Sequence, residues 1–381
     1  ELKRMKKILS ILIPVMILFS SYVSAEDPLP ELKAKSLILM EAGTGQILYE
    51  KNPDERLPIA SVTKVMTMLL TMEAIDSGKI SENDTVTASE RAKSMGGSTM
   101  FLETGEQISV HDILKGIAVA SANDGAVAIA EHLAGSETAF VEEMNKRAAE
   151  LQMENTHFVN TNGLDDDNHY SSARDVAIMS RELLLHPKIF EYTTIWMDTL
   201  RDGKFQLANT NKLIRFYRGA NGLKTGSTSK ALCCLSATAE RDGMQLVAVV
   251  LGAPTSKDRF AAASGLLDYG FANYKTEKAV TAGESLESVP VEKGVKPSVS
   301  VAAKKDSVIL LSKKDAGEIE KKLSLPETAA APIIADSPAG TLEIYLDGKL
   351  YETVELVYEE DVPKKSFVAF WGEILRKLIS C

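Results

Sequence analysis

The chain has 381 residues, of which 45% are hydrophobic and 25% charged, and its formal net charge is -10. This composition is that of an ordinary globular protein with room for one large and one small domain, and the acidic balance argues against nucleic acid as a partner. The three cysteines, two of them adjacent, make a poor disulfide framework, and the five histidines never recur at a metal-ligand spacing. We therefore expect a fold held by its core, with no metal and no cofactor.

A secretory signal peptide is predicted over residues 1–25. From Met5 the chain reads "MKKILSILIPVMILFSSYVSA", which is a basic start, a short apolar core and a small-residue close. An uncleaved membrane span is the alternative, but the apolar core is short and serines end it. We therefore expect a protein that is secreted across the cytoplasmic membrane.

Strands are predicted at both ends of the next segment, residues 26–276, with helices between them. The stretch "KSLILMEAGTGQILYEKN" indicates two strands around a Gly-Thr-Gly turn, and "ALCCLSATAERDGMQLVAVVLG" indicates two more around an Asp-Gly pair. Between about residues 60 and 200, apolar residues recur at helical spacing. This order predicts an α+β domain in which both ends contribute to one antiparallel sheet and the helical insert covers it.

A small all-β domain is predicted over residues 277–363. There the stretch "TLEIYLDGKLYETVELVYEE" alternates apolar and polar residues around an Asp-Gly turn, as a hairpin does. The stretch before it, "EKKLSLPETAAAPIIADSPAG", is polar, carries proline and alanine, and contains no motif. We expect it to be a loop between strands.

The last segment, residues 364–381, is predicted to be an amphipathic helix that associates with a membrane. Charged residues lie on one face of this helix, and aromatic and aliphatic residues lie on the other. The apolar face consists of Phe367, Phe370, Trp371, Ile374, Leu375 and Leu378. In a secreted protein such a helix can lie in a membrane interface, with its lysines on anionic lipid. Packing on the β domain is the alternative, but the stripe is terminal and follows the basic pair Lys364-Lys365.

Ser61 and Lys64 form the first candidate catalytic pair, at the start of an apolar helical run. A serine hydroxyl is a weak nucleophile unless a neighbouring base removes its proton, and residues three apart on a helix share a face. Backbone N–H groups at the helix start could also stabilise the oxygen of an acyl intermediate. A lysine acts as a base only when its pKa is lowered by burial or by a second cation. Taken alone, the pair is as easily an N-cap serine followed by a surface lysine.

Two later segments strengthen the catalytic interpretation. Ser121 and Asn123 precede a second apolar helix and offer a hydroxyl to relay a proton and an amide to hold a substrate amide. The third segment, "GLKTGSTSKA", opens a strand in which Lys224 supplies a second cation and Thr225 a hydroxyl for a substrate carboxylate. Gly226 there leaves room for a substrate backbone to lie along the strand as an added strand.

Ser-x-x-Lys, a Ser-x-Asn element and Lys-Thr-Gly, in this order, are typical of penicillin-binding proteins and class A β-lactamases. From about residue 32 to 375 the chain further resembles the low-molecular-mass serine-type D-alanyl-D-alanine carboxypeptidases of bacterial walls. The likeness rests on "PIASVTKVMT", "SANDGAVAIAEHLAG", "HFVNTNGLDDDNHYSSARD", "NTNKLI" and "GLKTGSTSKA". It implies a penicillin-binding/β-lactamase-like transpeptidase domain, a β domain, a terminal amphipathic anchor, and a place at the outer face of the cytoplasmic membrane or in the cell wall.

The resemblance also implies a role for each motif residue. Ser61 would be the acylated nucleophile and Lys64 its base, with Ser121 catalytic beside them. Substrate binding would fall to Asn123, Lys224, Thr225, Gly226 and Ser227, and the N–H groups of Ser61 and Ser227 would form the oxyanion hole. The expected substrate is a peptidoglycan stem pentapeptide that loses its terminal D-alanine through a serine acyl-enzyme, and β-lactams are the expected inhibitors.

Three alternatives stay open beside the carboxypeptidase. A β-lactamase uses a glutamate for fast deacylation, typically in a Glu-x-x-Leu-Asn element, and none occurs between Asn123 and Lys224. An endopeptidase acting on cross-links would use the same residues. A wall-binding protein without activity is disfavoured because the motif residues are intact. The sequence departs from the family pattern at Leu232, where the family usually has glycine. Because the reacting residues are intact, this change bears on the substrate preference more than on the mechanism.

Overall fold

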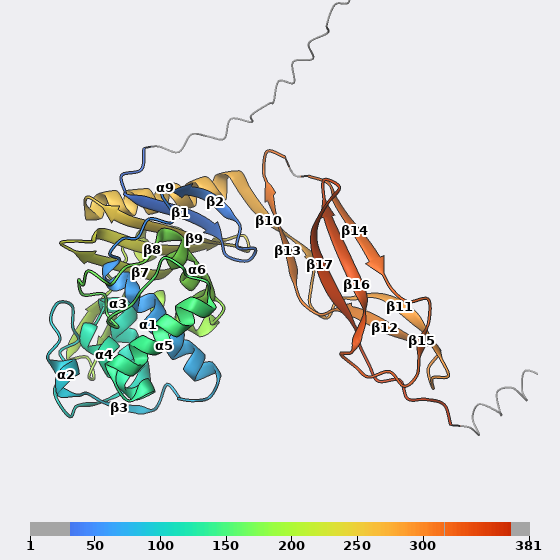
Figure 1. Ribbon diagram of the computed structural model, residues 1–381, viewed down its shortest axis with the longest axis horizontal. Coiled ribbons are helices and arrows are strands. Elements are labelled where there is room, and N and C mark those ends of the chain that lie inside the picture. The colour runs from blue at the N-terminus through green and yellow to red at the C-terminus, as the bar shows by residue number, and fades with distance from the viewer. Residues whose placement is uncertain (1–30, 316, 367–381) are drawn as a thin grey trace, which may run out of the picture.

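The computed structural model describes residues 31–315 and 317–366 (Figure 1). The predicted signal peptide and nearly all of the predicted terminal helix therefore lie outside the described residues. Within the described ranges, no helix is long and apolar enough to cross a membrane.

An antiparallel five-stranded sheet forms the centre of the first domain, with the strand order β2-β1-β9-β8-β7. The N-terminal strand β1 pairs with β9 from the far end of the domain, so the predicted assembly from both ends and the α+β class are confirmed. The strands of this sheet are β1 (Ser36–Glu41), β2 (Ile47–Lys51), β7 (Ala220–Thr228), β8 (Leu232–Arg241) and β9 (Met244–Ala253).

Helices cover both faces of this sheet, which explains why all six residues of β1 are buried. Ile38 belongs to the core shared with most of the helices, whereas Leu37 belongs to a second core that includes residues of α9. Figure 1 shows the long helix α9 on one side of the sheet and the other labelled helices on the opposite side. A strand buried on both faces is continuously apolar instead of alternating. The helical elements are η1 (Ala60–Thr63), α1 (Lys64–Asp76), α2 (Glu90–Lys93), α3 (Val110–Ala120), α4 (Asn123–Ala134), α5 (Glu137–Glu150), α6 (Ala173–Leu184), η2 (Pro187–Ile189), α7 (Phe190–Thr193), α8 (Leu213–Phe216) and α9 (Ser256–Asn273).

Two small antiparallel pairs complete the first domain. The first pairs β3 (Thr85–Thr87) with β4 (Gln107–Ser109), and the second pairs β5 (Met197–Leu200) with β6 (Phe205–Ala208). The strand β6 ends two residues before Thr210, whose hydroxyl accepts a hydrogen bond from Thr225 on β7. The second pair therefore lies close to the third motif.

The second domain is all-β and follows α9 without a linker. It contains a six-stranded sheet, in the order β14-β16-β17-β12-β11-β15, and the pair β10-β13 (Figure 1). Its strands are β10 (Tyr274–Val280), β11 (Ser285–Glu292), β12 (Ser298–Ala303), β13 (Ser307–Ser312), β14 (Ile319–Ser324), β15 (Ala329–Ala330), β16 (Pro338–Leu346) and β17 (Lys349–Tyr358).

The prediction that residues 320–340 form a loop between strands is wrong in part. Its beginning belongs to β14, which pairs with β16 along its full length. Because β14 is an edge strand whose residues are almost all exposed, its sequence lacks the apolar alternation that reveals a half-buried strand.

Candidate active site

Ser61 lies in the short 3-10 helix η1, and Lys64 is the first residue of α1. A 3-10 turn has three residues per turn, so side chains three positions apart lie one above the other. The Lys64 Nζ is therefore 2.9 Å from the Ser61 Oγ. Lys64 is 0% exposed, which excludes the alternative of an N-cap serine followed by a surface lysine.

The Lys64 amine has two further partners, both acceptors. Its Nζ donates to the Asn123 Oδ1 at 2.6 Å and to the main-chain oxygen of Asn162 at 2.7 Å. Burial, reinforced by the charge of Lys224, holds the pKa of Lys64 well below its ordinary value, against the opposing charge of Asp124. A neutral amine that donates two hydrogen bonds keeps one lone pair, and that lone pair is available to accept the proton of Ser61.

The second motif joins two helices beside this amine. Ser121 ends α3 in the left-handed conformation, with φ of 65°, and Asn123 begins α4. The Asn123 side chain donates to the Gly96 oxygen at 2.6 Å, which ties the segment before Met100 to the site. Asp124 accepts hydrogen bonds from the backbone N–H groups of Met100 and of other residues nearby, so the helix start is held on both sides.

The third motif lies on β7, the edge strand of the sheet, with Lys224, Thr225 and Gly226 all buried. A Cβ on Gly226 would lie 2.9 Å from the Ser61 nitrogen, so only glycine lets β7 approach the nucleophile this closely. Burial, and then the charge of Arg259, lowers the pKa of Lys224 to about 7. The edge of β7 that β8 does not occupy offers backbone groups to an added peptide strand.

Arg259 and Thr210 also belong to the site. Thr210 lies in the stretch "NTNKLI" quoted above, to which the sequence assigned no role, and no motif indicated Arg259. Arg259, on α9, is buried and donates to the Gly226 oxygen at 3.0 Å, and Thr225 donates to the Thr210 Oγ1 at 2.7 Å. Among the residues that the structure describes, no carboxylate forms an ion pair with Lys224 or Arg259, so the buried guanidinium of Arg259 has no anionic partner. Both residues are brought to the third motif by the fold from positions outside it.

Ser227 follows Gly226 on β7 with its side chain exposed. Its Oγ lies 3.9 Å from the thiol of Cys233, while the neighbouring Cys234 is fully buried. Burial raises the pKa of the Cys234 thiol to about 11, which makes this cysteine a core residue with little thiolate character. In the described part of the chain, no group of His, Cys, Asp and Glu residues is arranged to hold a metal ion.

His169 holds the loop before α6 against the nucleophile turn. Its Nδ1 accepts from the Val159 N–H, so its Nε2 carries the proton and donates to the Thr63 Oγ1 at 2.7 Å. Burial lowers the pKa of His169 to about 4, so the ring is neutral at physiological pH. It is therefore a structural contact and not the base for Ser61.

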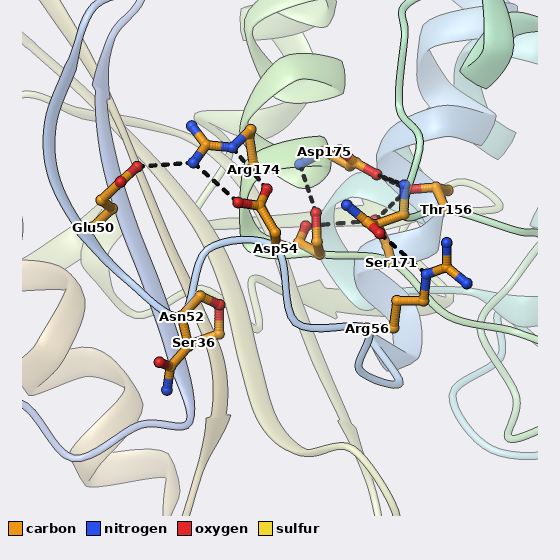
Figure 2. A network of polar contacts seen from close by, with 11 residues as sticks. Ser36, Glu50, Asn52, Asp54, Arg56, Thr156, Ser171, Arg174 and Asp175 are labelled. Atoms are coloured by element: carbon orange, nitrogen blue, oxygen red, sulfur yellow. Dashed lines mark hydrogen bonds and ion pairs between the residues drawn. The ribbon is translucent and has the colours of Figure 1, made fainter.

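A network of polar contacts fixes the same loop from its other end (Figure 2). Arg174 donates to Asp54 at 2.7 Å and to Glu50 at 2.9 Å, and Figure 2 shows both carboxylates turned toward its guanidinium. Asp175 accepts from the Thr156 hydroxyl at 2.7 Å. The network therefore connects the segment before η1, which contains Asp54, with the start of α6, which contains Arg174 and Asp175.

The chain was compared with known proteins. A family model described as D-alanyl-D-alanine carboxypeptidase matches residues 22–255, and another, described as the C-terminal domain of penicillin-binding protein 5, matches residues 274–364. The chain belongs to the D-alanyl-D-alanine carboxypeptidase family. It is 44% identical to the D-alanyl-D-alanine carboxypeptidase DacF of Bacillus subtilis, over 89% of this chain and 88% of that protein.

Solved structures extend the likeness of this carboxypeptidase to its fold. Penicillin-binding protein 5 from Haemophilus influenzae is 36% identical, with a TM-score of 0.74, and the match covers 88% of this chain and 99% of that one. Penicillin-binding protein D2 from Listeria monocytogenes, solved in an ampicillin-bound form, is 33% identical with a TM-score of 0.59; the match covers 64% of this chain and 100% of that one. The predicted family, fold and serine hydrolase class are confirmed, and neither the β-lactamase nor the endopeptidase alternative is favoured.

Leu232 marks the one visible departure of this carboxypeptidase from the family pattern. Its φ is 58°, in the left-handed region that glycine adopts without strain. Leu232 thus holds a backbone conformation that favours glycine, and it pairs with Thr228 at the far end of β7. The third motif itself remains in register with β8.

Proposed function

We propose that this carboxypeptidase removes the terminal D-alanine of peptidoglycan stem peptides, with Ser61 as the acylated nucleophile. The observation that carries the proposal is the 2.9 Å contact between the Ser61 Oγ and a fully buried Lys64 amine. Lys64 takes the proton of Ser61 as its oxygen attacks the carbonyl, and the N–H groups of Ser61 and Ser227 receive the developing negative charge. The leaving D-alanine takes a proton from the site, and water then hydrolyses the ester. A β-lactam acylates the same serine.

The positive charge of the site supports a substrate with a free carboxylate. Lys224 and Arg259 are buried without a carboxylate partner among the described residues, and an isolated buried charge is costly. A substrate carboxylate beside Thr225 offsets that cost, and it directs cleavage to the last peptide bond of the chain. Release of D-alanine from a peptide ending in Lys-D-Ala-D-Ala, with covalent labelling by penicillin, tests the assignment.

Replacing Thr225 with valine should raise KM for the peptide ending in a free carboxylate by about 10- to 100-fold, since a hydrogen bond to a charged group is lost. For the same peptide ending in a carboxamide, the KM of the variant should match that of the wild type. Steady-state kinetics with both peptides gives the comparison. Thr199→Val, an exposed position on β5, is the matched control. An equal loss on both peptides would contradict carboxylate recognition by Thr225.

We also propose that the protein is secreted and held at the outer face of the cytoplasmic membrane by its terminal segment. Support comes from the signal-peptide pattern of residues 1–25 and the apolar stripe of residues 367–378. The β domain ends next to this stripe, so it would stand between the membrane and the catalytic domain.

Replacing Phe370 and Trp371 together with serine should lower partitioning onto anionic vesicles at least tenfold, because the two largest apolar groups of the stripe are removed. Cosedimentation of the mature chain with vesicles of mixed phosphatidylglycerol and phosphatidylcholine measures this. Glu373→Gln, on the charged face, should bind at least as well as the wild type. If the wild-type chain stays in the supernatant, the stripe packs on protein and the membrane proposal fails.

A further inference from the structure

The loop before α6 is fastened to the nucleophile turn at two places. Near its start, the Asn162 oxygen accepts from the Lys64 Nζ at 2.7 Å, and a Cβ on Gly163 would lie 1.8 Å from a main-chain oxygen of η1. Further along, the His169 Nε2 lies 2.7 Å from the Thr63 Oγ1, which also belongs to η1. The residues between these two places are therefore held at a set distance from the nucleophile.

Asp165, which lies between these two places, contacts the last residue of β7. The Thr228 Oγ1 donates to the Asp165 Oδ1 at 2.6 Å, and the same hydroxyl oxygen accepts from the Ala231 N–H at 3.0 Å in the turn that follows β7. The ion pair of Lys230 with Asp167, at 2.6 Å, is a second contact between the same two segments. The Thr228 hydroxyl thus ties the end of β7 and its turn to the loop.

The position of this end of β7 decides the geometry of the oxyanion hole. One proposed donor, the Ser61 N–H, lies on η1, and the other, the Ser227 N–H, lies on β7 directly before Thr228. The two segments touch at Gly226, where a Cβ would lie 2.9 Å from the Ser61 nitrogen. A donor stabilises an oxyanion only from about 2.7–3.1 Å, so a small movement of the strand end away from η1 lengthens one of the two hydrogen bonds.

We propose that Asp165 is a positioning residue, which holds the end of β7 beside the nucleophile turn and so keeps the Ser227 N–H directed at the oxyanion. The inference rests on the proposed roles of Ser61 and Ser227. Asp165 acts through Thr228, one residue away from the donor. Acylation and hydrolysis of the acyl-enzyme both form a tetrahedral intermediate whose negative oxygen occupies the same hole. The loss of Asp165 therefore slows both steps by the same factor and leaves the first, noncovalent complex unchanged.

Replacing Asp165 with alanine should slow acylation by labelled penicillin and hydrolysis of the adduct by about 10-fold each, the lower end of the range for a hydrogen bond to a charged group. The dissociation constant of the noncovalent complex should stay within about twofold of the wild-type value. Asp165→Asn keeps an oxygen that can accept from Thr228, so it should retain both rates within about threefold. Stopped-flow acylation and decay of the adduct, followed by mass, measure these quantities on the mature chain.

A double-mutant cycle tests whether Asp165 acts through the Thr228 hydroxyl. Thr228→Val removes the hydroxyl and keeps the shape of the side chain, so it should also slow both steps by about 10-fold. Because the two changes remove the same hydrogen bond, the double variant should be no slower than the slower single variant. The control is Thr44→Val, which removes a hydroxyl–carboxylate bond of 2.7 Å to Glu41 after β1 and should change neither rate.

Three results would overturn the inference. The first is that the two losses multiply in the double variant, because the residues would then act independently. The second is that both rates in Asp165→Ala equal those of the wild type, and the third is that a weaker noncovalent complex accounts for the whole loss. A wild-type chain that forms no adduct would instead overturn the proposed nucleophile, so the two failures are distinguishable.

Discussion

Replacing Ser61 with alanine should abolish both D-alanine release from a peptide ending in Lys-D-Ala-D-Ala and covalent labelling by penicillin. Among the described residues, Ser61 carries the only hydroxyl that forms a hydrogen bond with the Lys64 amine. Without this hydroxyl no acyl-enzyme can form. We expect a loss of about 10⁴-fold or more in kcat/KM, comparable to the loss of a nucleophile in other serine hydrolases. D-alanine release is measured on the mature chain, and the adduct by mass.

The fold should survive this change, because Ser61 contributes little buried surface and η1 is held by neighbouring contacts. Ser94→Ala, an exposed serine at the end of α2, is the matched control and should keep full activity. Penicillin labelling that persists in Ser61→Ala would assign the nucleophile to another residue. If penicillin labels the wild type but no D-alanine is released, the serine is reactive and the substrate is a different one. Cross-linked peptides would then be tested.

Replacing Lys64 with methionine should lower the rate of acylation by about 10²- to 10⁴-fold, the range for a general base. Methionine preserves the length and burial of the side chain but cannot accept a proton. In the wild type, acylation should increase with pH through the lowered pKa of Lys64, because only the neutral amine is a base and the proton is lost as pH rises. Stopped-flow acylation by penicillin across pH measures both effects.

Arginine at position 64 separates the base from a purely electrostatic role. It keeps the positive charge and never deprotonates in this range, so Lys64→Arg should be as impaired as the methionine variant. Lys230→Met, which removes a surface ion pair with Asp167, should retain the wild-type pH dependence. Activity retained in Lys64→Arg would contradict proton transfer to Lys64.

The three motifs and the order of strands and helices were accessible from the sequence because they depend on local spacing. Ser61 and Lys64 are three residues apart, so any helical turn brings them together. The apolar periodicity of the insert and the hairpin patterns at both ends predicted the α+β domain, since these patterns reflect which faces are buried. The edge strand β14 escaped prediction because an exposed strand has no such pattern.

What only the tertiary structure decided is the electrostatic and hydrogen-bonding environment of those motifs. Whether Lys64 is buried, and therefore a base, depends on Asn123 and Asn162, which lie 59 and 98 residues away along the chain. Arg259 reaches the third motif from α9 by the same kind of long-range contact. The sequence by itself determined which chemical groups are present and which are adjacent along a turn. Their protonation follows from desolvation and from contacts between distant segments, which no local pattern encodes.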